Sequence, residues 1–127
     1  PQGAIEVNER MESSIPSIYA IGDVTGKFLL AHVASHQGIV AATNATGGHS
    51  VMHYNAVPAV VFTHPECAAV GLTLEKAKEL GYEAQIAKFP FQALGKSQAA
   101  IETDGFAQLI VESRTHQILG AQVVGYE

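Results

Sequence analysis

The chain has 127 residues, of which 47% are apolar and 15% charged, a composition typical of a globular protein that buries one real core. Its net charge of −5 and the absence of any basic run argue against nucleic acid as a partner. The apolar stretches are short and interrupted, which argues against a membrane span, and a single cysteine with no visible signal peptide argues against a disulfide scaffold and favours a cytoplasmic protein.

The N-terminal part of the chain predicts two strands followed by a helix. A short strand is expected at residues 4–7, and the apolar run at residues 18–21 is typical of a buried strand. This second run ends on Gly22-Asp23. An alanine-rich segment then predicts a helix over residues 30–46, with Gly47 and Gly48 as its stop. The segment is too short to form a domain alone.

The remainder of the chain predicts a second unit made mainly of strands. Thr73 is a typical helix N-cap residue, Glu75 lies in the first turn of that helix, and Gly81 follows as a stop. The polar stretch at residues 113–117 predicts a hairpin. Strands are expected at residues 57–62, 68–72, 83–89, 106–112 and 118–124. Two strands, a helix and three more strands predict an α+β fold on an antiparallel sheet.

The pair Gly22-Asp23 is the first candidate for a binding site. Gly22 allows the backbone to pass close to a large ligand, and Asp23 places a carboxylate at the carboxyl end of the expected strand, where open α/β sheets bind ligands. A solvated turn aspartate or a helix cap is the alternative for these two residues. The helix expected after them offers unpaired backbone N–H groups and a partial positive charge at its N-terminus, which suit an anion.

A longer motif surrounds this pair. The run SSIPSIYAIGDV at residues 13–24, followed by Leu30-Ala31-His32, resembles the second flavin-binding motif of the pyridine nucleotide-disulphide oxidoreductases. The resemblance implies that Asp23 accepts hydrogen bonds from the ribityl hydroxyls of FAD. It also implies that the segment from Leu29 runs under the pyrimidine edge of the flavin, with N–H groups aimed at N1 and O2. The expected cofactor-binding residues are Gly22, Asp23, Leu29, Leu30, Ala31 and His32.

The second unit resembles the dimerisation domain of the same family. The matching runs are VPAVVFTHPE at 57–66, VGLT at 70–73, FPFQA at 89–93, GFAQL at 105–109 and ILGA at 118–121. The FPFQA run favours the branch that oxidises dihydrolipoamide over the glutathione reductases. Cys67, Leu94 and Lys96 depart from the family pattern, which often has an aliphatic residue, Asn and Arg at these places. Val60 and Phe62 match positions on the nicotinamide side of the flavin pocket, and a role as core strand residues is the alternative.

The resemblance implies a fold, a reaction and partners. Residues 1–50 are expected to be the strand–helix end of an α/β FAD-binding domain, and residues 51–127 a truncated antiparallel-sheet dimerisation domain. The protein would oxidise dihydrolipoamide and reduce NAD through FAD and a cysteine pair, as a homodimer serving a lipoyl-bearing protein of a 2-oxoacid dehydrogenase complex. Alternatives are another disulfide oxidoreductase, such as mercuric or glutathione reductase or a soluble transhydrogenase, and a non-catalytic dimerisation module.

Features that this chain lacks limit what it is expected to do alone. It contains no Gly-x-Gly-x-x-Gly, and Cys67 is its only cysteine, so neither a dinucleotide fingerprint nor a redox-active cysteine pair is present. Because the chain starts at Pro1, we expect a piece of a larger protein that is inactive by itself and carries no catalytic residue. His32 and His36 have metal-ligand spacing on a helix, but no third ligand is placed, so no metal site is expected.

Overall fold

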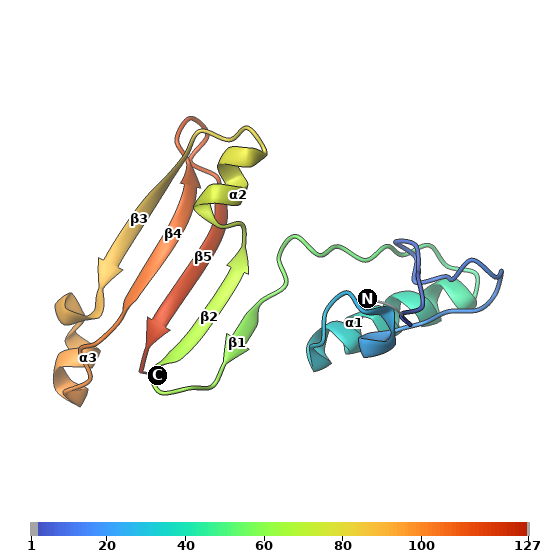
Figure 1. The fold of residues 1–127 in the computed structure, drawn as a ribbon, viewed down its shortest axis with the longest axis horizontal. Coiled ribbons are helices and arrows are strands. Elements are labelled where there is room, and N and C mark those ends of the chain that lie inside the picture. The colour runs from blue at the N-terminus through green and yellow to red at the C-terminus, as the bar shows by residue number, and fades with distance from the viewer. Residues whose placement is uncertain (1–2, 127) are drawn as a thin grey trace. The chain divides into compact units, whose positions relative to one another are not determined.

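A five-stranded antiparallel sheet, in the order β1-β2-β5-β4-β3, is the largest element of the structure (Figure 1). This computed structural model describes residues 3–126 and divides into two units, with the division between Tyr54 and Asn55. We call these the first and the second unit, and the whole sheet belongs to the second. Pro1, Gln2 and Glu127, at the ends of the two predicted domains, lie outside the described residues.

The strands of the second unit agree with the predicted ones. Their bounds are β1 (Ala59–Val61), β2 (Glu66–Gly71), β3 (Ala84–Pro90), β4 (Phe106–Glu112) and β5 (Ile118–Gly125). All neighbouring strands are antiparallel, and the polar stretch at residues 113–117 joins β4 to β5 as a hairpin. The prediction of an α+β fold built on an antiparallel sheet is therefore confirmed.

Helix α2 (Leu74–Glu79) begins and ends as predicted. The Thr73 hydroxyl accepts a hydrogen bond from the Lys76 N–H at 3.2 Å, which makes Thr73 the N-cap. Gly81, with φ +86°, follows the helix as its stop. The helix packs at one end of the sheet (Figure 1), where it contacts β3. Ala77 of this helix and Ile110 of β4 are fully buried. A short 3₁₀ turn η2 (Phe91–Ala93) and the helix α3 (Gly95–Ala100), neither of them predicted, lie at the other end.

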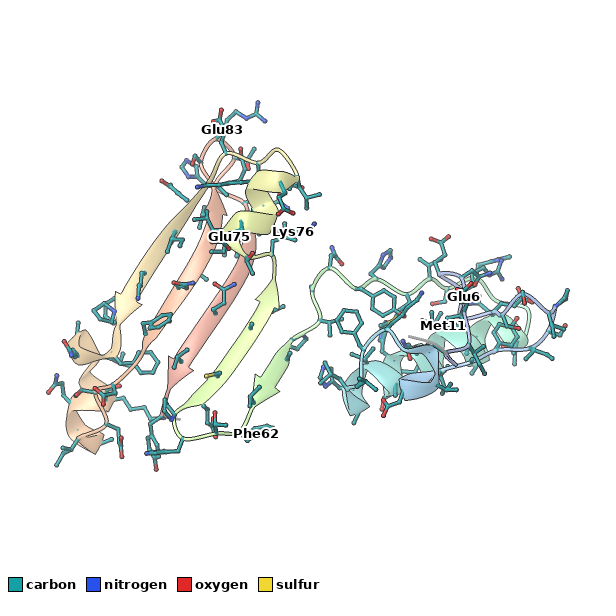
Figure 2. All side chains as sticks on the ribbon, in the orientation of Figure 1. Glu6, Met11, Phe62, Glu75, Lys76 and Glu83 are labelled. Carbon is teal, nitrogen blue, oxygen red and sulfur yellow. The ribbon has the colours of Figure 1, made fainter. Side chains whose placement is uncertain are left out.

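One face of the sheet is apolar from edge to edge. A single row of register partners consists of Val60, Ala68, Val123, Ala107 and Phe89. The neighbouring row on the same face consists of Val70, Ala121, Leu109 and Ala87. Val60 and Phe89 are 40% and 49% exposed, and after β1 Phe62 is 83% exposed (Figure 2). This much exposed apolar surface is typical of an interaction face.

The helix predicted in the first unit is also confirmed. After a 3₁₀ turn η1 (Gly22–Thr25), helix α1 (Ala31–Ala45) begins at Leu30 as N-cap and ends at Thr46. Its buried residues recur with the helical period and form one face. They are Val33, Gln37, Val40, Ala41 and Asn44. Among residues 3–126, no helix is long and apolar enough to cross a bilayer.

The two strands predicted in the first unit are wrong. Residues 4–7 are irregular, and within residues 18–21 only Tyr19 forms an isolated bridge, with Glu12. Ile18 and Ile21 are 51% and 42% exposed instead of buried. Ile21 has extended dihedrals, but a buried strand needs ladder partners, and no described residue of this unit supplies a strand beside it.

Gly71 provides a test of how tightly the second unit is packed. It has φ +74°, and a Cβ there would overlap the Leu119 carbonyl oxygen and lie 2.9 Å from Gly120 Cα. Gly81 also has positive φ, at +86°, but no atom within 4 Å of such a Cβ. Gly71→Ala should therefore lower the free energy of unfolding by about 1–3 kcal/mol more than Gly81→Ala does. Urea denaturation of both variants measures this difference, and equal losses would mean that the backbone at Gly71 can yield.

Glu112 should make the stability of the β4–β5 hairpin depend on pH. The Thr115 hydroxyl and N–H both donate to its carboxylate, and these bonds hold the pKa of the largely buried Glu112 below its ordinary 4.5. Because the folded pKa is the lower one, this stabilisation is present above the unfolded pKa and is lost as the pH falls through the folded value. Glu112→Gln should therefore destabilise the chain at pH 7 and flatten the decline of stability below about pH 4.5, as measured by thermal unfolding over a pH series. A decline as steep as in the parent chain would assign the acid sensitivity to other carboxylates.

Candidate functional site

The turn at Gly22 is clamped on both sides. Its N–H donates to Gln37 Oε1 at 2.6 Å, and its carbonyl oxygen accepts from the buried Thr25 hydroxyl at 2.8 Å. Gly22 has φ +72°, and a Cβ there would lie 3.3 Å from the Ala34 Cβ on α1. The turn thus packs closely on the helix in a conformation that favours glycine.

Asp23 combines a fixed backbone with an available side chain. Its carbonyl oxygen accepts the Gly26 N–H at 2.9 Å, which closes η1. The residue is exposed, and its carboxylate makes no hydrogen bond or ion pair with any described residue. A carboxylate presented in this way can accept hydrogen bonds from the hydroxyl groups of a ligand.

The N-terminus of α1 is open to an anion. Leu30 gives no side-chain cap, and the first turn holds no acidic residue, whereas α2 is capped by Thr73. The N–H groups of Val33 and Ala34 both donate to the Leu30 carbonyl, at 3.1 and 3.0 Å. The Ala31 N–H has no acceptor among the described residues. This donor and the helix dipole together favour negative charge at the start of α1.

The structure places all the predicted cofactor-binding residues in the first unit. Gly22 and Asp23 lie in η1, which packs on α1, and the other four lie at or just before the start of that helix. Leu29 is 73% exposed, and Ala31 and His32 are exposed as well. The Asp23 carboxylate can accept hydrogen bonds from ribityl hydroxyls, and the Ala31 N–H, with its small side chain, suits the anionic edge of a flavin. The role of these residues in binding stays a prediction.

Sequence reasoning missed the residues that support this turn. Gln37 is fully buried, and its Nε2 donates to the Tyr54 hydroxyl at 2.9 Å. The Tyr54 ring stacks on Phe28 with centroids 5.2 Å apart, and the Lys27 ammonium lies 5.4 Å from its centre. The available signal was a glutamine in the middle of the buried face of α1, where an unpaired amide would be unfavourable.

The remaining candidates do not form sites of their own. Within residues 3–126, no group of three or more His, Cys, Asp or Glu side chains is arranged to hold a metal, so His32 and His36 do not belong to such a group. Cys67 is a half-buried free cysteine in β2. Val60 and Phe62 are 40% and 83% exposed, so they are not core residues of the described chain.

Comparison with known proteins agrees with both units. The profile of the pyridine nucleotide-disulphide oxidoreductase dimerisation domain matches residues 57–127, and the profile of pyridine nucleotide-disulphide oxidoreductase matches residues 1–38. Dihydrolipoyl dehydrogenase of Chlamydia pneumoniae is 55% identical over 124 residues, which are 98% of this chain and 27% of that protein. The mitochondrial dihydrolipoyl dehydrogenase of Sus scrofa is 42% identical over 125 residues, 98% of this chain and 25% of that protein.

Solved structures show the same fold. LpdA from Mycobacterium tuberculosis matches with a TM-score of 0.87 and 30% identity, over 96% of this chain and 27% of that one. The HOCl-induced flavoprotein disulfide reductase RclA from Escherichia coli matches with a TM-score of 0.85 and 27% identity, over 99% of this chain and 29% of that one. The chain thus spans 25–27% of the length of the curated relatives named above. The dimerisation-domain profile covers more than half of the chain, and the chain belongs to the pyridine nucleotide-disulphide oxidoreductase family.

Proposed function

We propose that this chain is part of a flavoprotein dihydrolipoyl dehydrogenase, which oxidises dihydrolipoamide and reduces NAD through FAD and a cysteine pair outside the chain. The identity to proteins of that name, 55% for the Chlamydia pneumoniae relative, supports the reaction. The observation that carries the flavin role is the pairing of an unengaged Asp23 carboxylate with an uncapped α1 N-terminus in one unit. The bound FAD supplies the electron transfer between the dithiol and the nicotinamide.

The residues of this chain bind and orient the cofactor. Asp23 accepts hydrogen bonds from the ribityl hydroxyls, and because its carboxylate is charged these bonds are stronger than neutral ones. The start of α1 directs N–H groups at the N1–O2 edge of the flavin, where negative charge develops on reduction. A helix N-terminus stabilises such charge by about 1 kcal/mol in a partly buried setting. Ala31 is small enough to allow the close approach that this requires.

The two units take different roles in this proposal. Residues 1–50 are the C-terminal segment of the FAD-binding domain, and residues 51–127 are the dimerisation domain. The exposed apolar rows of the sheet support a homodimer, because a second copy would remove that surface from water. The proposed protein is cytoplasmic, and its further partner is a lipoyl-bearing protein of a 2-oxoacid dehydrogenase complex.

A second candidate function is another disulfide oxidoreductase of this family. The similarity to RclA, a flavoprotein disulfide reductase with a TM-score of 0.85 to this chain, favours this alternative. Assays of the full-length protein with dihydrolipoamide, glutathione disulfide and mercuric ion separate the two. NAD reduction that depends on dihydrolipoamide supports the first proposal, and its absence alongside activity on another substrate supports the second.

The flavin role of Asp23 is tested by a matched pair of substitutions. Asp104 is also an exposed aspartate, but it lies in the irregular segment before β4, in the other unit. In the full-length protein, Asp23→Ala should lower FAD retention, since it removes charge-assisted hydrogen bonds of about 1.5–3 kcal/mol. Asp104→Ala should leave retention unchanged. Flavin absorbance per purified polypeptide measures both, and equal flavin content would remove Asp23 from the site.

Homodimer formation is tested by light scattering over a range of protein concentrations. The second unit should associate into dimers as the concentration rises, because its apolar sheet face is unfavourable in water. The measured mass should approach twice the 13.4 kDa of the chain. A chain that stays monomeric at high concentration would show that this unit does not dimerise by itself.

A further inference from the structure

Gln37 joins the Gly22 turn to Tyr54 through a fully buried amide. Its Oε1 accepts the Gly22 N–H at 2.6 Å, and its Nε2 donates to the Tyr54 hydroxyl at 2.9 Å. The Tyr54 hydroxyl in turn lies 3.8 Å from the sulfur of the fully buried Met11. The amide therefore has one defined orientation, with its oxygen toward the turn.

Gln37 is the described group that accepts the hydrogen bond of the Gly22 N–H. An apolar residue at position 37 would leave that buried N–H without an acceptor, which destabilises the turn conformation. The next residue of the same turn is Asp23, whose carboxylate makes no hydrogen bond or ion pair with any described residue. No hydrogen bond or ion pair of its own side chain therefore holds Asp23 in place. The direction of its carboxylate depends on the backbone of the turn, which the two hydrogen bonds at Gly22 hold.

We propose that Gln37 is a positioning residue for the flavin nucleotide: its bond to the Gly22 N–H fixes the turn from which Asp23 meets the hydroxyl chain of the cofactor. This inference rests on the proposed function, because it assigns Asp23 to the flavin site. Gln37 touches the turn and not the cofactor, so it acts only through Asp23. Its substitution should weaken FAD binding only while the Asp23 carboxylate is present.

Asn44 provides a matched control on the same helix face. It lies two turns after Gln37, is 5% exposed, and is likewise a hydrogen-bonded amide. Its Nδ2 donates to the Ser50 and Arg10 carbonyls, at 2.8 and 3.0 Å, and its Oδ1 accepts from the Ser50 N–H at 2.9 Å and from the Arg10 guanidinium at 3.3 Å. Replacing either amide by leucine disturbs α1 in a similar way, but only the change at Gln37 frees the Gly22 N–H.

The experiment measures the dissociation constant of FAD from the full-length apoprotein by flavin fluorescence, together with apoprotein stability in urea. Gln37→Leu should weaken FAD binding about tenfold, whereas Asn44→Leu should change it less than about twofold at a similar loss of stability. Gln37→Glu keeps an oxygen acceptor for Gly22 and should bind within about threefold of wild type. In an Asp23→Ala background, Gln37→Leu should have less than about a twofold effect. If the Gln37→Leu apoprotein does not fold, Tyr54→Phe, which removes the partner of the amide, takes its place in the cycle.

The outcomes separate this inference from the proposed function. Wild-type protein that does not bind FAD would overturn the proposed function and the inference with it. Asp23→Ala that binds FAD as tightly as wild type would remove Asp23 from the flavin site and overturn the inference, while the proposed reaction would stand. FAD binding that depends on Asp23 but is weakened equally by the Gln37 and Asn44 changes would overturn the inference alone. The same holds if Gln37→Leu has an equal effect with and without Asp23, because that is the result of a purely structural role.

Discussion

The close packing of the Gly22 turn on helix α1 is the constraint on which the candidate site depends. Glycine is required there because φ is +72° and Ala34 leaves little space for a Cβ. Once the backbone is this close to the helix, the Gly22 N–H is buried and needs an acceptor, which Gln37 supplies at 2.6 Å. The result is an exposed Asp23 in a hydrogen-bonded turn that packs on a helix without a side-chain cap.

The helices α1 and α2 differ in how the donors of their first turns are satisfied. The short helix α2 satisfies its first turn with the Thr73 hydroxyl and an acidic Glu75, whose pKa is lowered by a backbone hydrogen bond and by Thr73. The longer helix α1 has neither, although it has 15 residues and α2 only six. The Ala31 N–H at its start has no acceptor among the described residues, and together with the helix dipole this donor suits an anion.

The second unit shows a similar contrast between internal packing and open surface. Glycines at the ends of the strands allow the chain to cross closely, as at Gly71, where the Leu119 carbonyl occupies the space of a side chain. The apolar face runs across the sheet from β1 at one edge to β3 at the other and is partly exposed. Val60 and Phe89, on these two edge strands, are 40% and 49% exposed. The strands of this sheet therefore pack closely against one another, while one apolar face stays exposed to solvent, as is typical of an interaction surface.

The sequence by itself determined the elements whose signals are local. Thr73 and Gly81 delimit α2, the alanine-rich run delimits α1, and short apolar runs separated by polar turn segments mark the strands, so the α+β class could be predicted. It also indicated Asp23 and the start of α1 as candidate site residues. Only the tertiary structure decided that residues 18–21 are no strand, because a strand depends on partners far away in the chain. It alone joined Gly22, Gln37 and Tyr54, because hydrogen bonds between residues 15 and 17 positions apart depend on how the turn packs on the helix and not on any local pattern.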